Sequence, residues 1–271
     1  MDMTNQVAVI TGGASGIGRA VGAALARRQV AGVALVDRSE AVEEVAAALN
    51  AEAGRAFAVG FQGDTTDEGF RRSVFDAMGR QFGRVSLCVP AAGITRDDLA
   101  VRVDKTTGKA RIYPLEQFRQ VVEVNLIAPV YWALEMIGRV AEDRAAAGLK
   151  RWTPAEPIQG SVVFIGSISS QGNRGQIAYA STKAGLEGAA ATIMKEAMFH
   201  GVRCSVIHPG FTDTPMVRAM GTDYVEKNIL PFTQLGRLIR PDEIADAIVF
   251  MLGNAAVSGE LWVDAGWHAP A

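Results

Sequence analysis

Short apolar runs rich in β-branched residues alternate along this 271-residue chain with longer amphipathic runs rich in Ala and Leu. The short runs are apolar on both faces, as strands buried inside a parallel sheet must be. We predict strands at Val7–Thr11, Gly32–Asp37, Ala56–Phe61, Val85–Val89, Ser161–Ile165, Val202–His208 and Glu260–Asp264. We predict helices at Gly16–Arg28, Glu40–Ala53, Asp67–Phe82, Leu115–Ala147, Gln176–His200 and Pro241–Leu252. This alternation indicates right-handed βαβ units and therefore an α/β fold with a doubly wound parallel sheet.

No linker rich in Pro, Ser or charge divides the chain, so we predict a single domain over residues 1–271. Three segments depart from the alternation. Residues 94–114 alternate apolar and polar around a Gly-containing turn, which predicts an inserted β-hairpin. Arg144–Gly160 contains two prolines and is predicted to be an exposed loop. Residues 209–232 form a long connection without clear periodicity, which is typical of a lid over a substrate.

The composition excludes several classes of protein. Hydrophobic residues make up 49% and charged residues 21%, which excludes a mainly disordered chain. A net charge of -2 argues against a nucleic-acid binder. We expect no membrane helix, which needs an apolar stretch of roughly 18 residues, and no secretory signal, because no apolar region follows the first basic residue, Arg19. Cys88 and Cys204 are too few for a disulfide framework, so a reducing, cytoplasmic location is expected.

A glycine-rich turn, Thr11–Gly18, lies between the first predicted strand and the first predicted helix. Its glycines, Gly12, Gly16 and Gly18, are spaced G-x-x-x-G-x-G. Glycine lets the backbone turn tightly and approach a ligand closely. The helix N-terminus then offers free N–H groups and a positive dipole end to a pyrophosphate. The alternative is a tight strand–helix corner, but the position at the first βα junction favours a dinucleotide site.

Two acidic residues end the strands that follow this turn. Asp37 lies 19 residues after Gly18, where a carboxylate accepts hydrogen bonds from both adenosine ribose hydroxyls and repels a 2′-phosphate. NAD is therefore favoured over NADP, although Arg38 offers a cation to a phosphate. Asp64 can hydrogen-bond to the adenine amino group. The alternative for both acids is an ordinary helix N-cap.

Tyr179 and Lys183 are spaced i, i+4 on a predicted helix, which puts the phenol and the ammonium on one face. A free Tyr has a pKa of roughly 10 and is a poor acid or base at neutral pH. A nearby cation stabilises the phenolate and lowers that pKa. We therefore predict that Tyr179 exchanges a proton with an alcohol or carbonyl oxygen.

These features occur in one order along the chain, with Asn125, Ser167 and Pro209-Gly210 among them. From Val7 to Gly266 the chain resembles the classical short-chain dehydrogenases/reductases. The resemblance implies a Rossmann-type fold, a nicotinamide cofactor and hydride transfer to or from a secondary alcohol or ketone. The combination of motifs is specific for fold and cofactor class and unspecific for the substrate.

The resemblance implies a role for each matching residue. Tyr179 would be the general acid/base, Lys183 would bind the nicotinamide ribose and tune Tyr179, and Ser167 would hold the substrate oxygen. Asn125 would support a proton-relay water, and Thr214 would bind the nicotinamide carboxamide. The implied cofactor-binding set is Gly12, Ser15, Gly16, Ile17, Gly18, Asp37, Arg38, Asp64, Thr65, Ala92, Gly93, Tyr179, Lys183, Pro209, Gly210, Thr212 and Thr214.

Two positions depart from the family pattern. The family commonly has Asn-Asn-Ala-Gly after the fourth strand, whereas residues 90–93 read Pro-Ala-Ala-Gly, which keeps the close backbone approach and loses two amide side chains. The spacing from Ser167 to Tyr179 is 12 residues, one shorter than usual. Ser169 is an alternative catalytic serine, but Ser167 is preferred because it directly follows a strand and Gly166.

The sequence indicates the substrate less specifically than it indicates the cofactor. Ile94–Asp97 resembles the same stretch in 3-oxoacyl thioester reductases, most of which prefer NADPH. An NAD-linked 3-hydroxyacyl-CoA dehydrogenase of this family would account both for this stretch and for the NAD preference that Asp37 indicates. Cations near the predicted hairpin either meet a CoA phosphate or form a solvated surface: Arg96, Arg102, Lys105, Lys109 and Arg111. Alternatives are a polyol or sugar dehydrogenase and, from another class, a non-catalytic NAD-binding regulator.

We expect a small-molecule alcohol or ketone as substrate, and neither nucleic acid nor membrane as partner. The three histidines, His200, His208 and His268, lack the spacing of metal ligands, so no metal is expected. In the family, the helices that start at Leu115 and Gln176 form a subunit interface. The resemblance therefore implies a homo-oligomer, either a tetramer or a dimer.

Overall fold

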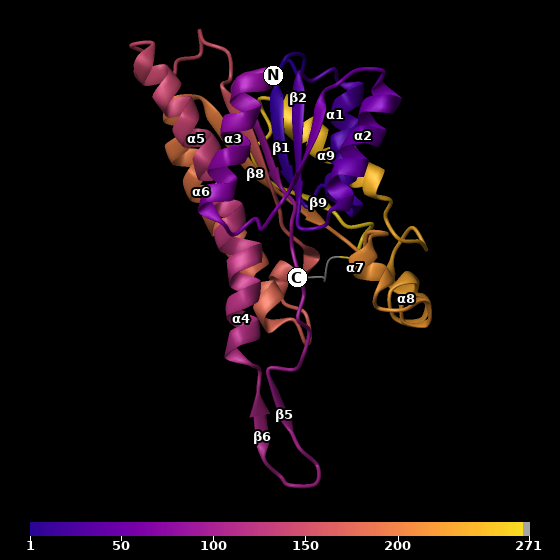
Figure 1. Ribbon diagram of the computed structural model, residues 1–271. Coiled ribbons are helices and arrows are strands. Elements are labelled where there is room, and N and C mark those ends of the chain that lie inside the picture. The colour runs from indigo at the N-terminus through magenta and orange to yellow at the C-terminus, as the bar shows by residue number, and fades with distance from the viewer. Residues whose placement is uncertain (268–271) are drawn as a thin grey trace.

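Seven parallel strands form the central sheet of the computed structural model, which describes residues 1–267 (Figure 1). His268 therefore lies outside the described residues. The strands are β1 (Val7–Thr11), β2 (Gly32–Asp37), β3 (Ala58–Gln62), β4 (Leu87–Pro90), β7 (Gly160–Ile165), β8 (Val202–Pro209) and β9 (Gly259–Val263). Their order across the sheet is β3-β2-β1-β4-β7-β8-β9. The prediction of a single α/β domain with a doubly wound parallel sheet is confirmed.

Helices cover both faces of this sheet (Figure 1). One layer comprises α1 (Gly16–Arg27), α2 (Ala41–Ala53) and α9 (Pro241–Gly253), and the other comprises α3 (Glu68–Phe82), α5 (Ala128–Ala146) and α6 (Ile177–Ala197). Successive side chains of a strand point to opposite faces. Ile10 of β1 therefore packs in the cluster with Leu25 and Ile248, while Val9 packs in the cluster with Trp132 and Leu186.

Some boundaries differ from the sequence prediction for local reasons. β3 starts at Ala58 rather than Ala56, because the Asn50 Oδ1 atom accepts hydrogen bonds from the backbone N–H groups of Phe57 and Ala58. Arg144 was expected in an exposed loop but lies in the last turn of α5, where its buried guanidinium pairs with Glu156.

The predicted helix Leu115–Ala147 is interrupted. α4 (Leu115–Val122) is followed by a π-helical turn at Glu123–Ile127, and α5 begins after it. Pro129 has no N–H to donate to the carbonyl of Asn125, four residues earlier, so a regular α-helical ladder cannot continue there. π-Turns are often found at functional sites, and this one carries the predicted catalytic Asn125.

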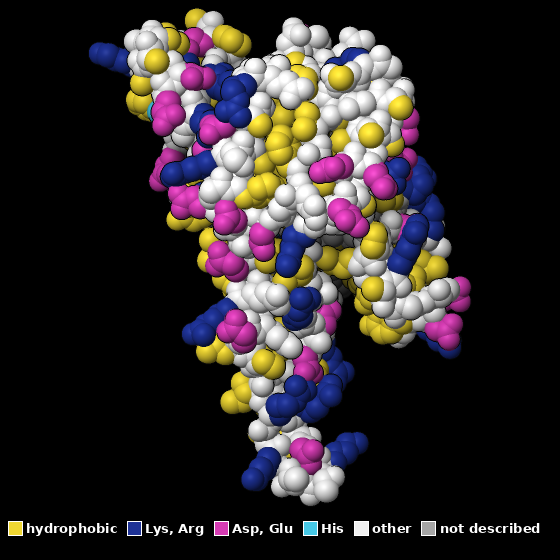
Figure 2. All heavy atoms as spheres, viewed as in Figure 1, with side chains coloured by type: hydrophobic (Ala, Val, Ile, Leu, Met, Phe, Trp, Pro, Cys, Tyr) yellow, Lys and Arg dark blue, Asp and Glu magenta, His cyan; other side chains and the backbone are white. Residues whose placement is uncertain are grey.

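Two segments extend beyond the carboxyl end of the sheet, at the lower side of Figure 1. Residues 94–114 contain an antiparallel hairpin of β5 (Val101–Val103) and β6 (Ala110–Ile112). Residues 209–232 contain α7 (Pro215–Arg218) and α8 (Thr222–Asn228), although their sequence has no clear periodicity. Lys and Arg side chains gather on the hairpin, whereas apolar side chains mark the second segment (Figure 2).

One helical stretch of the described residues, Leu115–Ala146, is long and apolar enough by length and composition to cross a membrane, with a mean hydropathy of 1.3. The expectation that no stretch reaches this threshold is therefore wrong. The core helix of a globular protein meets the same criterion, and Trp132, Met136 and Val140 of this helix are fully buried in the layer beside the sheet.

Both cysteines are buried, Cys88 in β4 and Cys204 in β8, and burial raises the pKa of both thiols. Only the thiolate reacts readily. We therefore expect neither Cys88 nor Cys204 to be modified by an aromatic disulfide reagent in the folded protein, and both to be modified after denaturation. Rapid release of the reagent's chromophore in native buffer would contradict this burial.

Candidate functional site

A cleft of 440 Å³ lies at the carboxyl ends of β1, β2 and β4, where the order of the strands reverses. Ligands of doubly wound sheets usually bind at such a reversal. Most of the predicted site residues line this cleft: Gly12, Ser15, Gly16, Ile17, Gly18, Asp37, Arg38, Asp64, Thr65, Ala92, Gly93, Tyr179, Lys183 and Thr214. The structure thus brings together the glycine-rich turn, the two acids and the Tyr–Lys pair.

The remaining predicted residues, Asn125, Ser167, Pro209, Gly210 and Thr212, are not among those that line the cleft. A Cβ at Gly210 would stand 2.7 Å from the backbone oxygen of Asp264, and the Thr212 hydroxyl donates to the Gly210 carbonyl at 3.0 Å. Gly210 thus packs against the C-terminal segment and Thr212 bonds to Gly210, and their binding of the cofactor stays a prediction.

The cleft also takes in Ile94, Arg96, Pro215 and Met216, from the segments predicted to meet the substrate, and four residues that the sequence did not single out: Ala91, Gln120, Val124 and Ile165. Ile165 is the last residue of β7 and Ala91 follows β4, so their positions at strand ends could have identified them. Gln120 lies in α4 and accepts a hydrogen bond from Arg96 Nε at 3.1 Å. Because this hydrogen bond joins two different segments, neither segment alone predicts that Gln120 lines the cleft.

The glycine-rich turn packs too closely for side chains. Gly12 and Gly16 have φ of +70° and +51°, in the left-handed region that favours glycine. A Cβ at Gly18 would stand 2.2 Å from the Gly12 carbonyl oxygen. Among the described residues, Ser15 at the N-cap of α1 makes no side-chain hydrogen bond to the helix. The cradle therefore fits the pyrophosphate of a dinucleotide, which the first N–H groups of α1 would bind.

The two acids differ in their bonding. The Asp37 carboxylate accepts from the N–H of Ala14 at 3.1 Å and from the N–H of Ser39 at 3.0 Å, which fixes it between the glycine-rich turn and the end of β2. Asp64 Oδ1 accepts from both the N–H and the hydroxyl of Thr66, and these hydrogen bonds lower the pKa of its carboxyl group. Both carboxylates therefore have fixed positions in the cleft.

Asn125 joins the helical layer to the segment after β4. Its Oδ1 accepts from the N–H of Ile94 at 2.9 Å, and its Nδ2 donates to the carbonyl of Ile94 at 2.8 Å. The side chain is fully buried. Both polar ends are thus satisfied by one backbone residue, so Asn125 fixes the backbone that forms the cleft wall beside Gly93 and Ile94.

Tyr179 and Lys183 line the reacting end of the cleft, and Ser167, which does not line it, lies beside Tyr179. Ser167 is buried and lies close enough to the Tyr179 hydroxyl to lower the pKa of that phenol. The Lys183 Nζ donates to the carbonyl of Ile165 at 2.7 Å and lies 5.4 Å from the centroid of the Tyr179 ring. Burial lowers the pKa of Lys183 to about 8.

Burial dominates the pKa of Tyr179 in this state, and the expected lowering of that pKa by Lys183 stays a prediction. Burial raises the pKa of Tyr179 to about 12, and the hydrogen bond with Ser167 offsets only part of that rise. The ammonium is bonded to the carbonyl of Ile165 and shares its charge with that oxygen. Tyr179 is therefore a protonated phenol at neutral pH.

The buried His208 side chain contacts the backbone of Ser167. Its Nδ1 lies 3.3 Å from the backbone nitrogen and 3.2 Å from the backbone oxygen of Ser167, and its Nε2 lies 3.0 Å from Glu260 Oε2. Glu187 Oε1 is 3.8 Å from the same Nε2. One ligand atom from each of His208, Glu187 and Glu260 lies within 4.8 Å of the other two, so the three side chains are able to hold a cation together. The spacing of the histidines in the sequence did not predict this group.

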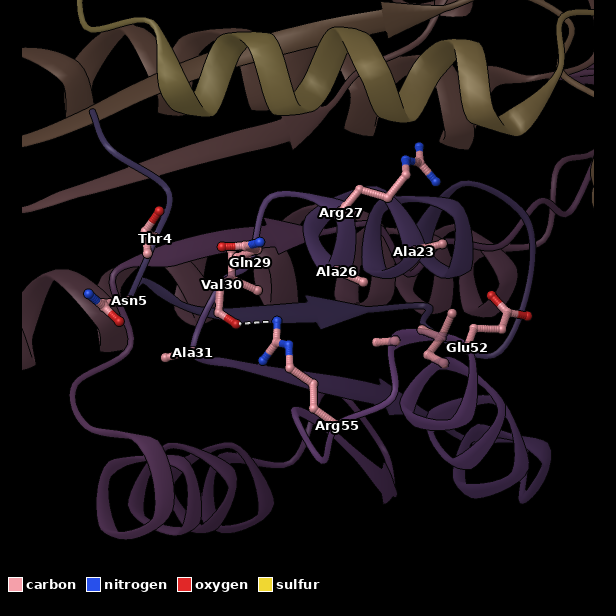
Figure 3. A pocket seen from close by; sticks show the side chains of 12 residues that line it. Thr4, Asn5, Ala23, Ala26, Arg27, Gln29, Val30, Ala31, Glu52 and Arg55 are labelled. Carbon is pink, nitrogen blue, oxygen red and sulfur yellow. Dashed lines mark hydrogen bonds between the residues drawn. The ribbon is translucent and has the colours of Figure 1, made fainter.

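A second hollow, of 730 Å³, lies near the opposite ends of the strands (Figure 3). Its wall includes Thr4 and Asn5 before β1 and the end of α1. Arg55 points into it and donates to the carbonyl of Val30 at 2.7 Å. The hollow is larger than the cleft, but none of the predicted catalytic or cofactor-binding residues lines it.

Replacing Gly18 tests the cradle directly. Because a Cβ there would collide with the backbone of Gly12, we expect Gly18→Ala to abolish NADH binding, as measured by quenching of tryptophan fluorescence. Gly79→Ala in α3 is the matched control, since a Cβ at Gly79 meets nothing within 4 Å. Equal NADH affinity in the two variants would contradict the proposed cradle.

Comparisons with known proteins agree with this geometry. The family model described as short chain dehydrogenase matches residues 6–225. The chain is 29% identical to 3-oxoacyl-[acyl-carrier-protein] reductase of Escherichia coli, covering 99% of both chains, and 34% identical to the enzyme of that name from Rattus norvegicus, covering 97% of this chain and 98% of the relative. It is 31% identical to (3R)-3-hydroxyacyl-CoA dehydrogenase of Canis lupus familiaris, covering 92% and 90%.

A solved structure supports the fold independently. A short-chain type dehydrogenase/reductase from Mycobacterium marinum superposes with a TM-score of 0.83 at 23% identity, covering 99% of this chain and 98% of that one. The structure has, at one edge of the sheet, the features that the sequence motifs indicate: the glycine-rich cradle, Asn125 and the Ser167–Tyr179–Lys183 group. The protein is a member of the short-chain dehydrogenase family.

Proposed function

We propose that this oxidoreductase transfers a hydride between NAD(H) and a 3-hydroxyacyl or 3-oxoacyl thioester. The observation that carries the proposal is the grouping of the buried Ser167 with Tyr179 and Lys183, at the end of a cleft that begins with a dinucleotide cradle. A binding module has no need for a phenol held in this way. The nicotinamide, when bound, supplies or accepts the hydride.

In this mechanism the protein's own residues bind the carbonyl oxygen and handle the proton. The Ser167 hydroxyl and the Tyr179 phenol both donate to the oxygen of the substrate, and Tyr179 gives up its proton as negative charge develops there. The nearby Lys183 ammonium stabilises the resulting phenolate. Asn125 keeps the opposite wall in place through Ile94.

The walls near the reacting end suit an acyl thioester. Ile94 and Met216 are apolar, and Arg96 donates to two neutral groups, the Gln120 side chain and the carbonyl of Thr95. An arginine with neutral partners keeps its charge available for the phosphate of an acyl carrier. The relatives named for acyl-carrier-protein and CoA substrates support this choice over a polyol or a sugar.

NAD is proposed as the cofactor because of Asp37. Its carboxylate is fixed at the end of β2, where it would accept from ribose hydroxyls and repel a 2′-phosphate. Arg38, next in the chain, also lines the cleft and is the feature that favours NADP. We expect the fixed anion directly at the strand end to outweigh the exposed cation.

Residues 209–232 are proposed to cover the bound substrate. Thr214 caps α7, and Thr214, Pro215 and Met216 all line the cleft. A Cβ at Gly16 would stand 3.0 Å from the Thr214 side chain, so this segment already touches the glycine-rich turn. Its position in the cleft supports the proposed binding of the nicotinamide carboxamide by Thr214.

A cytoplasmic homo-oligomer, a tetramer or a dimer, is proposed as the working form. Exposed apolar side chains at Ile127, Tyr131 and Leu134 follow helical spacing along the start of α5, and Ile177 is exposed at the start of α6. A stripe of this kind is typical of an interface between subunits. The two buried thiols fit a reducing compartment.

The proposed reaction is tested with acetoacetyl-CoA and NADH, followed at the absorbance of NADH. We expect turnover in the natural protein and a loss of about 10²- to 10⁴-fold in kcat for Tyr179→Phe, with NADH binding retained. Tyr131→Phe, which removes an exposed hydroxyl of α5, is the matched control. NADH binding without any turnover would remove this substrate and favour a polyol, a sugar or a regulatory role.

The proposed cofactor preference is tested by Asp37→Ala. Removing a charged hydrogen-bond acceptor and the repulsion of a 2′-phosphate should lower the ratio of kcat/KM for NADH to that for NADPH by about 10- to 100-fold. Glu40→Ala, which removes an exposed carboxylate three residues later, should leave the ratio unchanged. A natural protein that already prefers NADPH would refute the proposed role of Asp37.

A further inference from the structure

We propose that Asp97 and Gln176 form a hydrogen-bonded relay that positions the Ser167 hydroxyl and ties the base of the inserted hairpin to the reacting end of the cleft. Neither residue is part of the expected catalytic set. The inference rests on the proposed roles of Ser167 and Tyr179. It assigns Asp97 and Gln176 as positioning residues, which act through Ser167 rather than on the substrate.

Gln176 is the centre of the relay. It stands at the N-cap of α6, three residues before Tyr179. Its Nε2 donates to Asp97 Oδ2 at 2.8 Å, and its Oε1 accepts from Ser169 Oγ at 2.8 Å and from Asn173 Nδ2 at 3.1 Å. The carboxylate holds the amide in one orientation, because it can only accept. The oxygen of Gln176 is therefore kept toward Ser169.

Ser169 carries the relay to the reacting group. Its backbone N–H donates to Ser167 Oγ at 3.1 Å, in the short 3₁₀ turn Ile168–Gln171. Ser167 Oγ thus has one acceptor position filled, and its own proton remains available to the substrate oxygen. The chain of hydrogen bonds from Asp97 through Gln176 and Ser169 ends at Ser167, beside Tyr179.

The neighbouring Asp98 attaches the hairpin to the same loop. Its carboxylate lies 2.6 Å from Arg111 and 3.4 Å from Arg102, one arginine on each strand of the hairpin. Its backbone N–H donates to the carbonyl of Gly175 at 2.9 Å. Asp98 therefore clamps the hairpin, while Asp97 reaches the active-site loop. The two adjacent acids have separable tasks.

The relay also places a charge near the reacting phenol. Burial is the larger cause of the raised pKa of Tyr179, and the negative charge of the Asp97 carboxylate also raises that pKa. The other charged group that the described residues bring against Tyr179 is Lys183, from the same helix, and Arg96 lines the same cleft. Neutralising Asp97 must therefore lower the pKa of Tyr179. In alcohol oxidation, where the phenolate is the base, the rising limb of the pH–rate profile then moves to lower pH.

Three variants separate positioning from simple stability. Asp97→Ala breaks the relay, and we expect kcat to fall about tenfold, with KM little changed, on the scale of one lost charge-assisted hydrogen bond. Asp97→Asn keeps an acceptor for Gln176, and should restore kcat while moving the pH profile to lower pH. Asp98→Ala, the matched control, removes the clamp on Arg102 and Arg111 and should retain kcat and the pH profile.

Equal losses of kcat in Asp97→Ala and Asp98→Ala would overturn the proposal, since the junction would then serve only to hold the hairpin. An unchanged kcat in Asp97→Ala, or an Asp97→Asn profile that coincides with that of the natural protein, would also overturn it.

A second readout needs no substrate. The Ser169 amide, which donates to Ser167 Oγ, should exchange hydrogen for deuterium faster in Asp97→Ala than in Asp98→Ala. If the natural protein fails to turn over acyl thioesters, faster exchange in Asp97→Ala still supports the relay, and only the proposed substrate is lost. Equal exchange in both variants would overturn the relay whatever the substrate.

Discussion

The hydrogen bond between the Lys183 ammonium and the carbonyl of Ile165 is the contact on which the arrangement of this site depends. A buried cation needs a partner, and Lys183 finds one at the last residue of β7. That bond fixes α6 against the end of the strand. Tyr179, one turn before Lys183, is then brought to Ser167, which follows the same strand by two residues.

The parallel sheet brings this hydrogen bond to the same edge as the other residues of the site. All seven strands end at one edge, so the glycine-rich turn after β1, the Asp37 carboxylate after β2 and the group after β7 face one cleft. The reversal of strand order between β1 and β4 opens space there for a long ligand. One end of the cleft suits a pyrophosphate and an adenosine, and the other end suits a carbonyl.

Burial has opposite consequences for the two titrating groups. It raises the pKa of Tyr179 to about 12 and lowers the pKa of Lys183 to about 8, because in each case it disfavours the charged form. The two pKa values, which lie close together for the free side chains, thus move apart, and a proton transfer that leaves a phenolate beside an ammonium becomes more costly. Asp97 opposes that transfer by its charge while supporting Ser167 through Gln176.

The sequence predicted the features that depend on local pattern. The strands follow from β-branched runs, the cradle from glycine spacing, and the shared face of Tyr179 and Lys183 from i, i+4 geometry. It did not predict features that need a distant partner. The two hydrogen bonds of the Asn125 side chain depend on Ile94, and the raised pKa of Tyr179 depends on the burial that the fold gives it.

The central claim is that one cleft receives the dinucleotide in one direction, with its reactive end at Tyr179. A crystal structure of the complex with NADH tests this most directly. We predict that the adenosine ribose hydroxyls lie within hydrogen-bonding distance of Asp37, the pyrophosphate lies at the N-terminus of α1, and the nicotinamide ribose contacts Lys183. A dinucleotide bound in the reverse direction, or in the hollow beside Arg55, would contradict the account.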